Sequence, residues 1–465
     1  MGFTQVRKAV IFLIAIHMVD HAIAAESGHP WNVGLARTVI TPEQPVWLSG
    51  YYSRDRLPDG KVHDLYAKAV AFESTSTGTR LVLVTCDLGS IYQELTDQIA
   101  DAVHKQWKLP ASNLVINVSH THCAPEIAKE RIVFHDLKPE EEKKLANYIE
   151  NELQPKLVLL IGDSLADLKP ATLHIGRASA EFGRSRRFPT EEGNVVNRRY
   201  DAGLTENEVP VMKITAATGE LRGILFGYAC HNTTLAFYQF CGDYAGFAQE
   251  YVETNNPGCL AMFVMGCGGD QNPYPRHGPR GLEYARQHGG ELAAAVQRAI
   301  AGDLIEVHGP LRVAAETVRL ELEPLPPIAQ LEKDFQKGSG LEFRKAKYLL
   351  AQMKEHGEID LTQSCPLIAA RFGKELLFIA ISGETVVDFS LRSKIEFAGK
   401  HMTWVAGYNN DVFAYLPSRR VLLEGGYEGR SSIVHQLLPT PFQTNVEDLV
   451  MQGIRGIVAK VSTVE

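Results

Sequence analysis

Short apolar runs and longer amphipathic stretches alternate along the chain, and each pattern predicts a different element. Continuous apolar runs bounded by turn residues predict buried strands, whereas apolar residues every three or four positions predict helices. The strands are expected at residues 81–85, 114–118, 222–230, 260–265 and 376–381. The helices are expected at residues 91–107, 138–160 and 281–300. This alternation is typical of an α/β fold.

The last third of the chain breaks this pattern without a linker. Residues 312–323 alternate like an exposed strand, prolines follow at 324, 326 and 327, and residues 328–358 form a polar helical stretch. No repeat or low-complexity tract isolates a module. We therefore expect one large α/β domain over residues 26–465, with at most a soft boundary near the prolines.

The charge balance argues against nucleic acid as a partner. The 47 Lys and Arg residues are outnumbered by 55 Asp and Glu residues, which gives a net charge of −8. No run of basic residues is long enough to follow a phosphate backbone. The oligomeric state is left open by the sequence.

The first 25 residues have the pattern of a signal peptide. Arg7 and Lys8 precede an apolar run over residues 9–18, and Ala22, Ala24 and Ala25 resemble a cleavage site. The alternative is a membrane anchor, but this run is half the length of about 20 residues that a bilayer requires. No later segment is long and apolar enough to cross a membrane. The sequence thus predicts export, as a secreted or periplasmic protein.

Cysteine usage leaves two readings open. An exported protein with seven cysteines can form up to three disulfides. Their spacing is irregular and contains no Cys-x-x-Cys pair, and several lie in apolar strand-like runs. Buried free thiols are therefore the favoured interpretation.

Two histidines follow one of the predicted strands, in the segment Asn-Val-Ser-His-Thr-His-Cys-Ala-Pro at residues 117–125. Side chains two positions apart on an extended chain point the same way, so His120 and His122 are expected to face one cavity. Two neutral imidazoles placed in this way can bind one metal ion. Two purely structural histidines are the alternative.

Three further places put reactive side chains directly after a predicted strand, where α/β folds usually carry their active sites. His231 ends the strand at 222–230, although a single histidine there can be structural. Glu384 follows a glycine turn, which suits a metal ligand, an acid–base group or an ordinary surface residue. Asp270 and Asn272 follow a glycine-rich loop, which either approaches a bound group or forms an inert tight turn.

Several well-known catalytic motifs are absent from the sequence. It contains no HExxH, no GxSxG, no Walker loop and no GxGxxG at a strand-to-helix turn. Zincin, serine-hydrolase, nucleotide-binding and dinucleotide-binding functions therefore lose support.

Taken in order, these segments resemble the neutral/alkaline non-lysosomal ceramidase family over residues 32–435. Residues 33–41 are similar to the family's opening GxGRxDIT strand, and residues 85–89 to its TDLG element. Residues 119–125 match its THTHSGP motif, which is the most specific feature. The resemblance implies the single large mixed-sheet α/β catalytic domain of that family and hydrolysis of an amide bond. It does not extend to the immunoglobulin-like C-terminal domain of the full-length enzymes.

The resemblance also implies a zinc site and its neighbours. In the family, two histidines, a glutamate and a tyrosine hold Zn²⁺, and the matching residues here are His120, His231, Glu384 and Tyr415. Substrate-facing residues of the family match His122, Arg184 in the NRS-like segment, and Tyr427 in Gly-Tyr-Glu-Gly. A donor set of two nitrogens and two oxygens suits Zn²⁺ with a water in an open position.

One departure from the family affects the substrate. Where the family reads GDVSPN, residues 269–274 read Gly-Asp-Gln-Asn-Pro-Tyr, so that Asn272 replaces the serine implicated in ceramide cleavage. An amide can orient a substrate but cannot act as a nucleophile. The expected mechanism therefore uses a zinc-activated water.

Three functions stay open at this level. The first is a zinc-dependent amidase acting on a small N-acyl compound such as an N-acyl lipid. The second is a zinc hydrolase of a polar N-acyl or O-acyl carbohydrate. The third is a non-catalytic metal-binding relative, against which the four intact candidate ligands argue.

Overall fold

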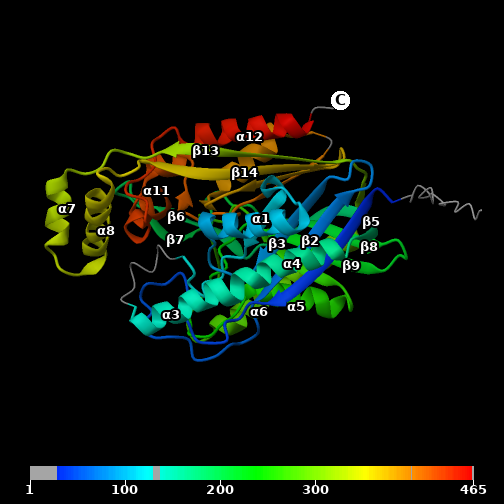
Figure 1. Cartoon of the computed structure of the whole chain (residues 1–465), viewed down its shortest axis with the longest axis horizontal. Helices are drawn as coiled ribbons and strands as arrows, with labels where there is room; N and C mark the ends of the chain where they lie inside the picture. The colour runs from blue at the N-terminus through cyan, green and yellow to red at the C-terminus, as the bar shows by residue number, and fades with distance from the viewer. Residues whose placement is uncertain (1–28, 129–136, 400, 463–465) are drawn as a thin grey trace, which may run out of the picture.

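The computed structural model describes residues 29–128, 137–399 and 401–462. Its centre is a nine-stranded sheet (Figure 1). In spatial order, the strands along its path are β10 (Leu260–Met265), β9 (Leu221–Tyr228), β8 (Glu208–Ala216), β5 (Lys169–Ser179), β1 (Trp31–Val39), β2 (Tyr66–Ser74), β3 (Arg80–Cys86) and β4 (Leu114–Val118), and β12 (Ile305–Val307) pairs with β5. The pairs β3–β4 and β9–β10 are parallel and the other pairs are antiparallel. The predicted mixed-sheet α/β fold is confirmed.

Both faces of this sheet are buried, which explains why its strands read as continuous apolar runs. On β3, Val82 and Val84 belong to the core beneath the helices, whereas Leu81 and Leu83 belong to the core on the opposite face. The helices of the first face are α1 (Gln93–Trp107), α3 (Pro139–Asn147), α4 (Gln154–Ala166), α5 (Asp243–Asn255) and α6 (Gly281–Ala301).

A second sheet covers the opposite face. Its strands, in order, are β13 (Leu311–Glu321), β14 (Thr362–Phe372), β15 (Leu376–Ile381) and β17 (Met402–Ala406). Phe72 of the large sheet meets Phe372 of the second sheet edge to face, with ring centroids 5.1 Å apart. Helix α12 (Val446–Ser462) packs along the outer side of β13 and β14 (Figure 1). The described part of the molecule therefore has four layers, in the order helices, large sheet, second sheet and helix. The sequence did not predict that two sheets would stack on each other.

Two predicted helices differ from the observed ones. The helix expected at residues 138–160 continues to Ala166 and contains a π-helical stretch at Tyr148–Leu153 between α3 and α4. The polar stretch at residues 328–358 is a hairpin of α7 (Ile328–Phe335) and α8 (Gly340–His356), which projects at one end of the molecule (Figure 1). The chain reverses there through two glycines with positive φ, Gly338 and Gly340.

Short elements at the strand ends carry much of the candidate site. Strands β6 (Gly183–Pro189), β7 (Val195–Tyr200) and β11 (Gln271–Pro273) form a small sheet, and β16 (Glu384–Thr385) pairs with β18 (Tyr415–Leu416). The remaining helices are α9 (Val387–Glu396), α10 (Arg419–Glu424) and α11 (Gly426–Gly429), with 3₁₀ turns at Ala111–Asn113 and Ser431–His435.

All seven cysteines are buried free thiols, as favoured from their apolar surroundings. Within the described ranges, no helix is both long enough and apolar enough to span a bilayer. The predicted signal peptide at residues 1–25 lies outside the described residues, so export stays a prediction.

Candidate metal centre

The four candidate ligands converge from separate strand ends. His120 follows β4, His231 follows β9, Glu384 follows β15 and Tyr415 begins β18. A carboxylate oxygen of Glu384 lies 3.2 Å from His120 Nε2 and 3.5 Å from His231 Nε2. The Tyr415 hydroxyl lies 3.2 Å from His231 Nε2. The structure thus brings all four predicted ligands to one buried point.

Backbone carbonyls orient both histidine ligands. His120 Nδ1 lies 2.5 Å from the Gly89 carbonyl oxygen, and His231 Nδ1 lies 2.7 Å from the Gly268 carbonyl oxygen. A carbonyl only accepts, so each Nδ1 carries the proton and each Nε2 presents its lone pair toward Glu384. His120 has a φ of +58°, an uncommon backbone conformation for a residue other than glycine. This arrangement is that of neutral imidazoles ready to bind a metal ion.

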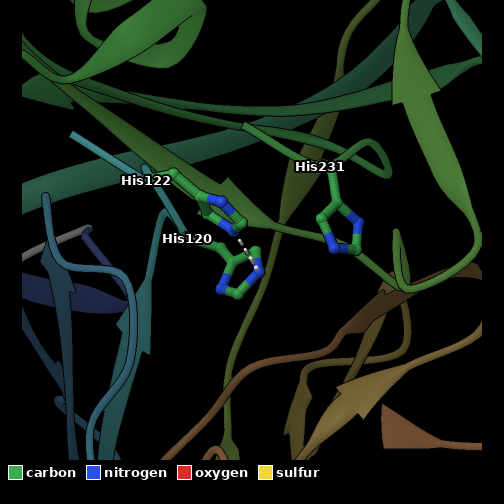
Figure 2. Close-up of side chains that lie close together, drawn as sticks. All are labelled: His120, His122 and His231. Atoms are coloured by element: carbon green, nitrogen blue, oxygen red, sulfur yellow. Dashed lines mark hydrogen bonds between the residues drawn. The ribbon is translucent and has the colours of Figure 1, made fainter. Parts of the chain in front are cut away.

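His122 is the third member of a compact histidine group, shown in Figure 2. One ligand nitrogen from each of His120, His122 and His231 lies within 4.8 Å of the others, and His122 Nε2 is 3.2 Å from His120 Nε2. The ring of His122 rests against Gly50, where a Cβ atom would lie 2.1 Å from Nδ1. Only glycine fits there, and its φ of +88° independently favours glycine.

Burial keeps the imidazoles of His122 and His231 neutral. It lowers the pKa of His231 to about 3, with a further contribution from the cation of Arg186. It also lowers the pKa of His122 well below the usual value, helped by His120 and His231. Burial and then Glu384 raise the pKa of the Tyr415 phenol, whereas Arg186 lowers it. The neutral nitrogens, the carboxylate and the phenol oxygen together fit a borderline divalent cation such as zinc.

Arg186 is a site residue that the sequence reasoning missed. Its Nη2 donates to the Tyr415 hydroxyl at 3.0 Å, and its Nη1 donates to Asn272 Oδ1 at 3.2 Å. Its Nε pairs with Glu428 at 2.6 Å, and all of these groups are buried. The segment Gly-Arg-Ser-Arg-Arg offers three arginines. Arg186 and Arg187 are both buried at a bulge of β6 and both pair with Glu428, and Arg186 is the one that donates to Tyr415.

Arg184, the arginine implied by the family motif, contacts other groups. Its guanidinium donates to the Gly183 carbonyl at 2.7 Å and lies 3.4 Å from a carboxylate oxygen of Asp201. The structure therefore places Arg186, rather than Arg184, beside Tyr415.

A small cavity of about 40 Å³ opens onto the metal-facing groups. It is lined by Gly50, Tyr52, His120, His122, Glu384, Tyr415, Tyr427, His435 and Gln436. Its rim is held by Lys345 of α8, whose ammonium donates to the carbonyls of Ile433 at 2.8 Å and Gln436 at 2.7 Å. Tyr427, predicted from the family motif to face the substrate, lines this cavity. Asn272 is fully buried behind Arg186 and is not part of this lining.

Comparison with known proteins defines the class of this chain. The sequence profile of the family "Neutral/alkaline non-lysosomal ceramidase, N-terminal" matches residues 31–304, more than half of the chain. The protein belongs to the neutral/alkaline non-lysosomal ceramidase family. The profile includes His120, His122, Arg184, His231 and Asn272, whereas the three remaining candidates follow it in the chain.

One curated relative is the neutral ceramidase of Pseudomonas aeruginosa, 25% identical over 300 residues. That match spans 59% of this chain and 44% of the relative, less than half of its length. The crystal structure of neutral ceramidase from the same organism has a TM-score of 0.70 at 21% identity, covering 91% of this chain and 73% of that one. A structure titled "Ceramidase complexed with C2" has a TM-score of 0.71 at 19% identity, covering 91% and 74%. These structures share the fold of nearly the whole described chain.

Proposed function

We propose that this protein is a zinc-dependent hydrolase that cleaves the amide bond of a small N-acyl compound. The observation that carries the proposal is the convergence of His120, His231, Glu384 and Tyr415 on one buried point beside a cavity. Membership of the ceramidase family supports the choice of an amide as the scissile bond. Zinc held by these four residues would supply a Lewis acid and an activated water at neutral pH.

The other residues of the cavity have roles that follow from their chemistry. The Tyr427 hydroxyl lines the cavity and can donate a hydrogen bond to the oxyanion that develops on the substrate carbonyl. His122 is neutral and lines the cavity, and its Nε2 lies 3.2 Å from the lone-pair nitrogen of His120, so this N–H can donate to the same oxygen or pass a proton to the leaving amine. Arg186 holds Tyr415 and Asn272 in place. No serine hydroxyl is needed in this scheme.

A second candidate substrate is a polar N-acyl or O-acyl compound such as an acylated carbohydrate. The cavity lining favours it, because the side chains around the metal-facing groups are tyrosine, histidine, glutamate and glutamine rather than aliphatic. A long acyl chain would find little apolar surface at this point.

The test is a hydrolysis panel on the purified full chain with zinc, with a chelator, and with zinc restored. We expect release of free fatty acid or acetate from at least one N-acyl substrate, lost with the chelator and recovered with zinc. The panel pairs a ceramide with an N-acetylated and an O-acetylated sugar. Bound zinc without hydrolysis of any of them would favour the non-catalytic alternative.

A further inference from the structure

Arg276 is a cation without a counter-charge beside the candidate site. It is partly buried, and its Nη1 donates to the Thr233 hydroxyl at 3.2 Å. Among the described residues, no carboxylate pairs with it, whereas neighbouring arginines do have such partners. Arg186 pairs with Glu428, and Arg280, four positions further on, pairs with Glu283 at 2.6 Å. A partly desolvated charge left unpaired is costly, so its presence needs a reason.

The surroundings of Arg276 increase that cost. Burial lowers the pKa of Arg276, and the nearby cation of Arg186 lowers it further, against an opposing effect of Tyr51. Asn272 Oδ1 accepts from Arg186 Nη1 at 3.2 Å and from the Thr233 hydroxyl at 3.5 Å, so Asn272 and Thr233 together connect Arg186 to Arg276. The Nδ2 of Asn272 is buried and has no hydrogen-bond partner among the described residues. Among the described residues, Asn272 Nδ2 thus lacks an acceptor and Arg276 lacks a carboxylate partner.

Two connections join Arg276 to the metal-facing groups. Thr233 follows the ligand His231 by two residues, in the same loop after β9. On the other side, His277 Nε2 lies 3.0 Å from the Tyr51 hydroxyl, and the Tyr51 ring lies edge-on to His122 with centroids 4.7 Å apart. The loop that carries Arg276 therefore contacts residues that pack against the candidate site, just outside the lining of the small cavity.

We propose that Arg276 binds a carboxylate on the substrate, so that the preferred substrate is an N-acyl amino acid or a related acidic N-acyl compound. The proposal rests on the amide hydrolase activity proposed above and specifies its substrate class. The acyl chain of such a compound is uncharged. Its amine portion carries a carboxylate a few bonds from the amide nitrogen. A guanidinium is the side chain best suited to a planar carboxylate.

The test compares two matched ligands that cannot be cleaved. One is the ketone in which CH₂ replaces the amide NH of N-lauroylglycine, and the other is the same ketone with a primary alcohol in place of the carboxylate. Binding to the zinc-loaded full chain is measured by calorimetry for the native protein, Arg276→Gln, Arg276→Lys and the control Arg280→Gln. We expect the native protein and Arg280→Gln to prefer the carboxylate. Arg276→Gln should lose about 10- to 100-fold of that preference, and Arg276→Lys should keep part of it.

Equal binding of the two ketones by the native protein, or an unchanged preference in Arg276→Gln, would overturn the proposal. Hydrolysis of N-lauroylglycine and N-lauroylethanolamine is then measured on the same proteins. Cleavage of both amides without any preference would reject the acidic substrate while the proposed amidase activity stands. Selective binding of the carboxylate ketone without cleavage of either amide would reject the amidase activity while the role of Arg276 stands.

Discussion

At the scale of single residues, the proposed metal centre depends on imidazoles whose orientation is set by their neighbours. His231 is fixed by the Gly268 carbonyl and shares the point between Glu384 and Tyr415. Loss of one of the four candidate ligands also leaves the other three poorly oriented for binding one metal ion. We expect His231→Ala to lose most of its bound zinc, measured by metal analysis of the purified protein. We also expect it to lose all hydrolysis, measured on the substrate panel. The exposed His308 is the matched control, and His308→Ala should retain one zinc per chain.

Full zinc occupancy in His231→Ala would show that the metal is held elsewhere. Restored binding in that variant at high zinc concentration alone would still agree with the assignment, since three donors remain.

Asn272 is the residue at which this chain departs from its family, and its position indicates an indirect role. It is fully buried and accepts a hydrogen bond from Arg186, which in turn holds Tyr415. Asn272→Ala should keep the metal and lose activity by about 10- to 10³-fold, as for one lost hydrogen bond near the reacting groups. Asn272→Ser should gain slightly in hydrolytic activity on a ceramide relative to its activity on the native substrate. Steady-state rates on a paired panel measure both.

Complete loss of activity in Asn272→Ala with zinc retained would mean that Asn272 itself takes part in bond cleavage. The water mechanism proposed above would then be wrong.

The candidate site shows which residues a sequence can reveal. The four ligands and His122 were predictable because each matches a family motif at a strand end. Arg186 was not, because the three arginines in Gly-Arg-Ser-Arg-Arg have equivalent chemistry, and only the fold shows which of the two buried ones donates to Tyr415. Arg276 was visible only as a residue near Asn272, since the absence of a counter-charge is a property of the folded chain.

At the scale of elements, a carboxyl group from a distant loop caps the N-terminus of helix α9. The backbone N–H of Val387, its first residue, donates to Asp270 Oδ1 at 2.9 Å. Burial raises the pKa of Asp270 to about 7, with a further contribution from Asp388. The folded state therefore holds a proton that the unfolded state releases near pH 3.9, so native stability falls as the pH rises from about 4 to about 7.

Asp270→Asn should remove this pH dependence while its side-chain oxygen still accepts from Val387. We expect the free energy of unfolding of the variant to rise relative to that of the native protein as the pH rises, by at most about 4 kcal/mol above pH 7. Urea unfolding at several pH values between 4 and 8 measures the difference. A constant difference across this range would contradict the raised pKa of Asp270.

Elements were predicted best where burial leaves a strong pattern. The strands β4, β10 and β15 begin and end where the apolar runs do, because both of their faces are buried. The edge strand β7 and the two-residue strands β16 and β18 have no such pattern, because tertiary pairing rather than local composition defines them. Two of the four ligands nevertheless sit on those short strands.

At the scale of the whole molecule, the candidate metal centre lies where the two stacked sheets meet. His120 and His231 follow strands of the large sheet, whereas Glu384 and Tyr415 follow β15 and β17 of the second sheet. Such stacking of two sheets cannot be read from a local pattern, since either sheet alone could bury its apolar face against helices. A metal ion bound by donors from both sheets would therefore stabilise their packing as well as its own ligands.

Zinc removal should accordingly lower the stability of the entire fold. A ligand that binds only the folded state adds about 4 kcal/mol when its free concentration is a thousand times its Kd. We expect a chelator to lower the midpoint of thermal unfolding of the native protein and added zinc to restore it, as followed by circular dichroism. His231→Ala, which lacks one ligand, should show little or no shift under the same treatment. If neither the chelator nor zinc changes the unfolding midpoint of the native protein, no metal joins the two sheets. The proposed zinc centre would then have to be abandoned.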